Sequence, residues 1–169
     1  MSESSQFLSV DTQVPESIET ILELKPTFLG FLQNVESQMK EMPGQVDLPV
    51  IHRFSPETKA GSGTYLREIF MPKGTLALSK EHTTEHFYVV LSGVATVWDQ
   101  NMDRILVKGP CVGITKPGTQ RLLYIHEDMK WICVHSTSET DLKKIEDMLI
   151  LNPKVATIIQ TEKVEELVN

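Results

Sequence analysis

The stretch Gly74-Thr-Leu-Ala-Leu-Ser-Lys-Glu-His-Thr-Thr-Glu-His-Phe-Tyr-Val-Val-Leu-Ser-Gly93 decides the fold of this chain. Glycines bound it, and its second half is rich in β-branched and aromatic residues, which predicts a strand, a turn and a second strand. Alternate side chains of a strand share one face. That face would line a cavity with two imidazoles and an ammonium, and its members are Lys80, His82, His86, Tyr88 and Val90. The alternative is that both histidines are ordinary half-buried strand residues.

A second segment, Gly113 to Arg121, contains the turn Pro117-Gly118. In spacing, the two segments resemble the two motifs of the cupin superfamily, whose usual metal ligands are three histidines and one glutamate. The matching positions here hold Lys80, His82, His86 and Arg121. The resemblance therefore implies an all-β fold, a cupin jelly-roll (double-stranded β-helix) barrel, with an altered ligand set.

A closer resemblance is to small single-domain cupin-like proteins of tailed phages. It rests on a first motif that includes Glu85 and His86, on the run from Pro117 to Arg121, and on His126-Glu127-Asp128. It covers roughly residues 47–150. It implies a phage-encoded protein that works in the host cytoplasm or travels with the virion, and it makes virion proteins candidate partners. It does not imply a particular activity.

Composition narrows the class of protein. A chain of 169 residues fits one domain, since domains average roughly 150 residues. The formal net charge of −7 argues against a nucleic-acid-binding surface. Cys111 and Cys133 lie in apolar runs, which favours two buried thiols over a disulfide or a metal site. The polar N-terminus and the lack of a long apolar run predict a cytoplasmic protein with no membrane partner.

Apolar periodicity and turn residues divide the chain into three parts. Residues 1–45 are expected to form a flexible arm and a helical leader that Pro26 interrupts. Residues 46–137 are expected to form the β-barrel, with one of its turns at His126-Glu127-Asp128. Residues 138–169 are expected to form a helical tail capped by Ser138 or Thr140, although the segment from residue 154 also suits a strand.

The helical leader is expected to cover exposed sheet or a second subunit, because bare sheet edges need covering. We therefore expect a homodimer or a higher homo-oligomer.

The candidate site combines metal ligands with cations. His82 and His86 are the best ligands for a divalent metal such as zinc, iron, nickel or manganese. A third ligand would come from His126, Glu85 or Glu68, whereas His135 at the end of the last barrel strand is expected to have a structural hydrogen-bonding role.

The cations predict a second ligand besides a metal. Lys80 and Arg121 favour a carboxylate or phosphate, because two cations beside a metal repel it and arginine grips oxyanions in a bidentate fork. The alternative is that Arg121 pairs with Glu68 or Glu85. The aromatic ring of Tyr88 is a further candidate for ligand contact, and His86 and His126 are the candidate catalytic acid–base residues.

Three functions remain open at this point. The first is binding of a small anionic molecule in the barrel, with or without a metal. The second is a cupin-type metal-dependent enzyme, an isomerase, lyase or dioxygenase. The third is a virion or tail accessory protein with a vestigial pocket. Fold alone does not decide among them.

Overall fold

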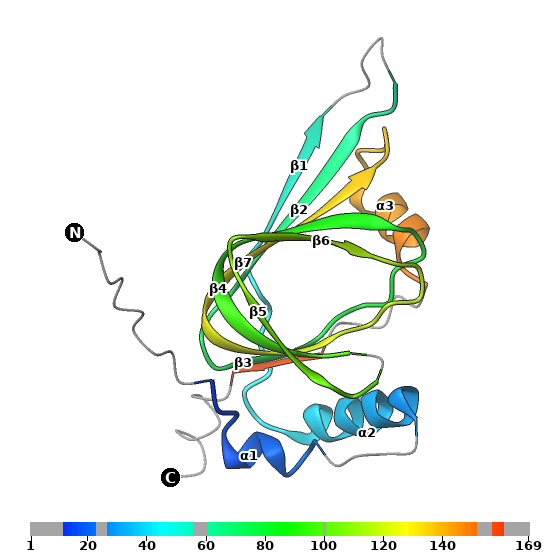
Figure 1. The fold of residues 1–169 in the computed structure, drawn as a ribbon. Coiled ribbons are helices and arrows are strands. Elements are labelled where there is room, and N and C mark those ends of the chain that lie inside the picture. The colour runs from blue at the N-terminus through cyan, green and yellow to red at the C-terminus, as the bar shows by residue number, and fades with distance from the viewer. Residues whose placement is uncertain (1–11, 23–26, 56–60, 100, 152–156, 161–169) are drawn as a thin grey trace, which may run out of the picture.

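The computed structural model describes residues 12–22, 27–55, 61–99, 101–151 and 157–160. Its centre is a curled antiparallel sheet that closes into a half-barrel, with the first two helices below it and the third beside its upper end (Figure 1). The all-β jelly roll predicted from the sequence is confirmed. Its strands are β1 Val50–Ser55, β2 Thr64–Met71, β3 Thr75–Leu78, β4 His86–Trp98, β5 Arg104–Lys108, β6 Cys111–Thr115, β7 Leu122–Ser136 and β8 Thr157–Gln160.

Strand β7 organises the sheet. Its C-terminal half pairs with β2 on one side and with β4 on the other, and β4 pairs in turn with β6. Because side chains alternate along each strand, these registers fix which residues face the barrel interior together. One buried interior row runs across four strands, and its members are Tyr65, His135, His86 and Thr115.

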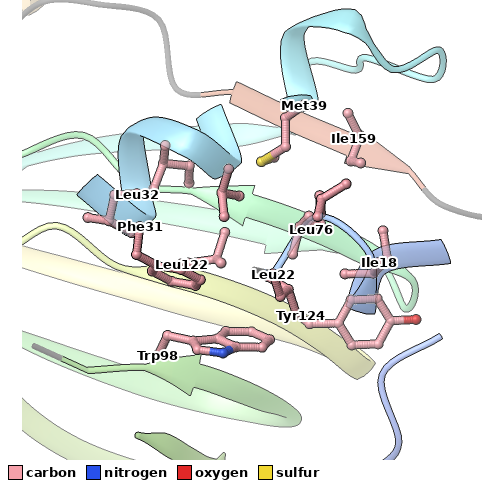
Figure 2. Packing of buried hydrophobic residues seen from close by; sticks show 13 residues of the cluster. Ile18, Leu22, Phe31, Leu32, Met39, Leu76, Trp98, Leu122, Tyr124 and Ile159 are labelled. Carbon is pink, nitrogen blue, oxygen red and sulfur yellow. The ribbon is translucent and has the colours of Figure 1, made fainter. Parts of the chain in front are cut away.

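The helical leader covers one end of the barrel. It forms α1 Glu16–Glu19 and α2 Phe28–Glu41, and the Thr27 side chain caps α2 by accepting a hydrogen bond from the Gly30 backbone N–H at 3.1 Å. The buried face of α2 packs against the strands (Figure 2). That cluster includes Ile18, Phe31, Leu32, Val35, Met39, Leu76, Trp98, Leu122, Tyr124 and Ile159. Of the two expected roles, the leader therefore covers the sheet of its own chain.

The C-terminal part differs from the predicted helical tail. Helix α3 spans Leu142–Leu149, and its cap is Asp141, whose carboxylate accepts a hydrogen bond from the Lys144 N–H at 3.1 Å. Ser138 and Thr140 do not cap it. Beyond α3, residues 157–160 form strand β8 on the edge of β3, so the helical interpretation of this segment is wrong and the strand alternative holds. The remaining tail residues lie outside the described part of the chain.

The predicted turn at His126-Glu127-Asp128 is also wrong, because these residues lie inside β7. Their polarity has a different cause. Glu127 and Asp128 are exposed, and the Asp128 carboxylate accepts a hydrogen bond from the Lys73 backbone N–H at 2.8 Å. The partner strand bulges here instead: the register of β4 against β7 shifts around Gly93, which has φ 97°.

Two smaller expectations have clear outcomes. Cys111 and Cys133 are both free thiols, the first half-buried and the second buried. Among the described helices, none has the length and apolar character needed to cross a membrane.

We predict that the leader contributes strongly to stability. Phe31 is fully buried, so Phe31→Ala should lower the free energy of unfolding by about 3–5 kcal/mol through lost burial and a cavity. Leu29→Ala, at an exposed position of the same helix, should change it by less than about 0.5 kcal/mol. Urea unfolding measures both, and equal effects would show that the leader does not hold the barrel.

Candidate metal and anion site

Three histidines meet at one end of the barrel interior. His86 begins β4 and His135 lies near the end of β7. The two are directly opposite each other if the pairing of Phe87 with Val134 is continued by one residue. Their ring centroids are 4.2 Å apart, and the His82 ring lies 4.4 Å from that of His86 and 5.6 Å from that of His135. One ring nitrogen from each residue lies within 4.8 Å of the other two.

His82 comes from a loop and not from the predicted strand. Residues 79–85 connect β3 to β4, and the C-terminal end of α3 holds this loop. The Thr83 N–H donates to the Leu149 carbonyl at 2.9 Å, and the Leu151 N–H donates to the Glu81 carbonyl at 3.0 Å. The Thr83 hydroxyl donates to the Met148 carbonyl at 2.6 Å. The position of His82 therefore depends on α3 as well as on the barrel.

Each of the three histidines has a buried ring nitrogen without a hydrogen-bond partner. These atoms are Nδ1 of His82, Nε2 of His86 and Nδ1 of His135. His86 shows the arrangement most clearly: its Nδ1 lies 3.1 Å from the Thr84 carbonyl and donates to it, which leaves Nε2 as a free lone pair. A buried polar atom without a partner costs free energy, so this cluster has a reason other than stability.

The pKa values of the three histidines are low. Burial, reinforced by the neighbouring imidazoles and by Arg67 and Arg121, lowers the pKa of His82 to about 3. Burial also lowers the pKa of His135 to about 4. The pKa of His86 falls mainly through burial, although its hydrogen bond to Thr84 opposes this. All three rings are therefore neutral near pH 7, which is the form that binds metals.

These residues fit a divalent metal. Three neutral imidazoles form a recognised ligand set that leaves further coordination positions open. Nitrogens at about 2.1 Å from one zinc ion lie roughly 3.4 Å apart, so the cluster would contract slightly around an ion. The hydrogen bond from His86 to Thr84 orients one ligand ring, as carbonyl acceptors do for metal-bound histidines.

A cavity of about 240 Å³ opens beside the cluster. Its apolar wall includes Ile69, Met71, Leu123 and Trp131. Its charged and polar lining consists of Asp47, Arg67, Ser79, Lys80, His82, His86, Thr115 and Arg121. A second chamber of about 230 Å³ lies beneath α3 and shares His82 and Arg67 with the first. The cavity thus combines candidate ligands with cations and an apolar floor.

Arg121 lines this cavity. Its Nη1 donates to the Thr115 hydroxyl at 3.0 Å, and its guanidinium carbon lies 5.3 Å from the centre of the Tyr88 ring. The Tyr88 ring stacks on Trp131 and lies so close to Gly113 that a side chain at Gly113 would collide with it. Tyr88 lines a neighbouring groove and supports Arg121 from below, so its role in ligand contact stays a prediction.

Arg121 pairs with neither Glu68 nor Glu85, the two acids considered as alternative partners. Glu68 instead pairs with Arg53 at 3.0 Å, and Glu85 is exposed. No described carboxylate forms an ion pair with Arg121. Lys80 lines the cavity, but its Nζ lies 2.8 Å from the Glu146 carboxylate on α3, so its charge is already matched.

His126 is far from the cluster. It is buried in mid-β7, its Nε2 lies 2.8 Å from the Thr96 hydroxyl, and its ring packs edge-on against Tyr124. Nine residues along an extended strand separate it from His135, which is about 30 Å. The predicted position at the barrel mouth is therefore wrong, and neither His126, Glu85 nor Glu68 supplies the third ligand.

Sequence reasoning missed two residues of the site. His135 was expected to be structural, yet it completes the cluster. Arg67 was not considered, although it lies on the inner face of β2 opposite Cys133. The sequence pattern that could have identified Arg67 is its place on one face of the strand, which it shares with Tyr65, Ile69 and Met71. Only the pairing of β2 with β7 shows which face of β2 lines the barrel interior.

Several solved structures are similar to this chain in fold. No protein-family model matches the chain, and no curated protein does. Ectoine synthase from P. lautus has 14% identity and a TM-score of 0.46, with 85% of this chain and 94% of that one covered. A cupin superfamily protein from Desulfitobacterium hafniense has 12% identity and a TM-score of 0.39, covering 53% and 78%.

A third similar structure is a conserved protein with a double-stranded beta-helix domain from Klebsiella pneumoniae. It has 18% identity and a TM-score of 0.41, with 60% of this chain and 84% of that one covered. At such identities no ligand and no activity carries over to this chain.

We predict a steep acid destabilisation of the metal-free protein. The folded state keeps His82 and His135 neutral, whereas the unfolded chain protonates them below about pH 6.5, so the unfolded state binds more protons. Stability is therefore full above pH 6.5 and lost as pH falls. Between pH 7 and pH 5 the loss should be about 2 kcal/mol for each group.

Urea unfolding at a series of pH values measures this loss. The double variant His82→Gln/His135→Gln should show a flatter profile over the same range. A wild-type profile that runs parallel to that of the double variant would contradict the prediction.

Proposed function

We propose that this barrel binds a divalent metal through His82, His86 and His135, with a small organic anion beside it. The observation that carries the proposal is the set of three buried imidazole nitrogens without partners, one from each residue. A bound ion would satisfy all three at once. Their low pKa values support this, because no proton has to be displaced near neutral pH.

The anion follows from the charges around the cluster. Arg121 and Arg67 both line the cavity, and neither forms an ion pair with a described carboxylate. A divalent ion would add to their positive charge in a poorly solvated cavity, where repulsion is strong. A carboxylate ligand would offset it, and the Arg121 guanidinium is suited to hold one in a bidentate fork.

The alternative function is a metal-dependent enzyme of the isomerase, lyase or dioxygenase kind. The observation that favours it is the number of ligands, since three protein ligands leave positions open as in catalytic sites. A bound metal would act as a Lewis acid toward a ligand in the cavity. Arg121 would orient that ligand, and the apolar wall would limit water. His126 is too far away to serve as the acid or base.

The metal is tested directly by stoichiometry. Wild-type protein dialysed against zinc, manganese, nickel or iron should retain about one ion per chain by elemental analysis. His135→Ala should lose most of it while its circular dichroism spectrum stays that of a folded barrel. His126→Asn removes a histidine outside the cluster and should keep the ion. A wild type that retains none of these metals would refute the metal part of the proposal.

From its resemblance to phage proteins, we propose that this protein acts in the host cytoplasm or in the virion. Its presence among the proteins of purified particles, by mass spectrometry, is the corresponding test. Its absence there would remove virion proteins from the candidate partners.

We also propose that the protein is a homodimer that pairs through the outer face of β4 and β6. Phe87 is 56% exposed, Val112 67% and Ile114 50%, and cross-strand pairing makes them neighbours. Leu91, on the same strand as Phe87, extends this apolar face. Half-exposed side chains of this size offer roughly 100 Å² each, so the four supply roughly half of the ~800 Å² per partner of a standard interface. A flat apolar face can pair with its own copy about a twofold axis.

Val112→Asp should convert the dimer to a monomer, because it would bury a charge at the centre of this face. Leu29→Asp adds the same charge at an exposed site on α2 and should leave the mass unchanged. Light scattering at tens of micromolar measures the mass. A monomeric wild type would overturn the association proposal.

A further inference from the structure

Arg67 and Arg121 both line the cavity beside the histidine cluster but come from different segments of the chain. Arg67 lies on the inner face of β2 opposite Cys133 of β7, and Cys133 lies opposite Tyr88 of β4. Arg121 lies above the Tyr88 ring. Arg67 thus reaches the cavity from β2, whereas Arg121 reaches it from the residue just before β7.

The electrostatic influence of the two arginines agrees with this placement. Arg67 lowers the pKa values of His82 and His135, and Arg121 lowers those of His82 and His86. Each guanidinium thus acts on a different pair of rings, and both act on His82.

Neither arginine has an acidic partner in the described part of the chain. The Arg67 side chain forms no hydrogen bond or ion pair there, and the carboxylate of Glu146, which is within its electrostatic range, is bonded to Lys80 and exposed. Asp47 also lines the cavity but forms no ion pair with a described residue. Setting Lys80, Arg67 and Arg121 against Glu146 and Asp47 leaves one positive charge, and a divalent ion raises it to three.

The space between the cations is apolar and small. Cys133, Trp131, Leu123 and Ile69 line it, and the cavity volume is about 240 Å³. At about 30 Å³ for each water-sized group, this has room for on the order of eight non-hydrogen atoms. A monoanion would leave one cation without a partner, and a phosphate ester concentrates both charges at one end. A dicarboxylate places one charge at each end and an apolar chain between them.

We infer that the cavity is built for a dicarboxylate of about four to six carbons, with Arg121 holding one carboxylate and Arg67 the other across the histidine cluster. This inference rests on the proposed metal and anion site, whose substrate class it names. Arg67 is the specificity-determining residue, because it distinguishes a diacid from a monoacid of the same length.

The test compares three probes on the zinc-loaded protein by isothermal titration calorimetry: glutarate, pentanoate and propyl phosphate. Glutarate and pentanoate have the same number of carbons and differ by one carboxylate. Wild-type protein should bind glutarate at least tenfold more tightly than either other probe. Arg67→Met and Arg121→Met should each reduce glutarate binding to the level of pentanoate, and each should change pentanoate binding by less than about threefold, because one arginine remains. The double variant should bind neither acid.

Arg53→Met is the matched control. It removes an arginine paired with Glu68 outside the cavity, so all three affinities should stay as in the wild type. Wild-type protein could bind glutarate and pentanoate equally well, and each single variant could lose both. That result would show that both arginines hold the same carboxylate. It would overturn the inference but leave the proposed function standing. Tighter binding of propyl phosphate would also overturn it. A protein that binds neither zinc nor any acid would instead refute the proposed function.

Discussion

The site depends on one constraint, the position of β7 between β2 and β4. Antiparallel pairing on both sides of β7 leaves no freedom in which residues meet, because a shift of one residue would turn every side chain to the other face. The registers that place Tyr65 beside His135 also place His135 beside His86. The row below is fixed in the same way and places Arg67, Cys133 and Tyr88 side by side. The positions of His86, His135 and Arg67 are therefore consequences of sheet pairing.

The interior of this barrel is not optimised for stability. Three imidazoles are buried with unpaired nitrogens, and two guanidiniums share the cavity without acidic partners in the described residues. Each of these features costs free energy in an empty barrel. The opposite end of the barrel contrasts with this, because the leader seals it with Phe31, Val35 and Met39 in a purely apolar cluster. The end of the barrel that the leader covers therefore stabilises the fold, whereas the end with the histidines and arginines is suited to ligand binding.

Helix α3 links the site to an element outside the barrel. The loop that carries His82 is bonded through Thr83 to the end of α3, and Lys80 is bonded to Glu146 of the same helix. The helix itself rests on a small cluster of Tyr65, Ile145 and Leu149. Elements with few buried contacts open at low free energy, so a ligand bound at His82 would also stabilise α3 against opening.

The sequence by itself determined the fold class, the helical segments of the leader, the α3 segment and two of the three histidines; the predicted break at Pro26 lies outside the described residues. These features are local, since spacing, turn residues and apolar periodicity express them within a short stretch of chain. It also placed Arg121 in the cavity, through the Pro117-Gly118 turn.

Only the tertiary structure decided the rest. His135 and Arg67 belong to the site through pairing between strands that are distant in the sequence, and no local pattern records such pairing. His126 shows the converse, because its polar neighbours resembled a turn while a bulge at Gly93 in the partner strand let β7 run on without a break. Identical residue types on one strand thus took different roles, since register and position along β7 set what each imidazole faces.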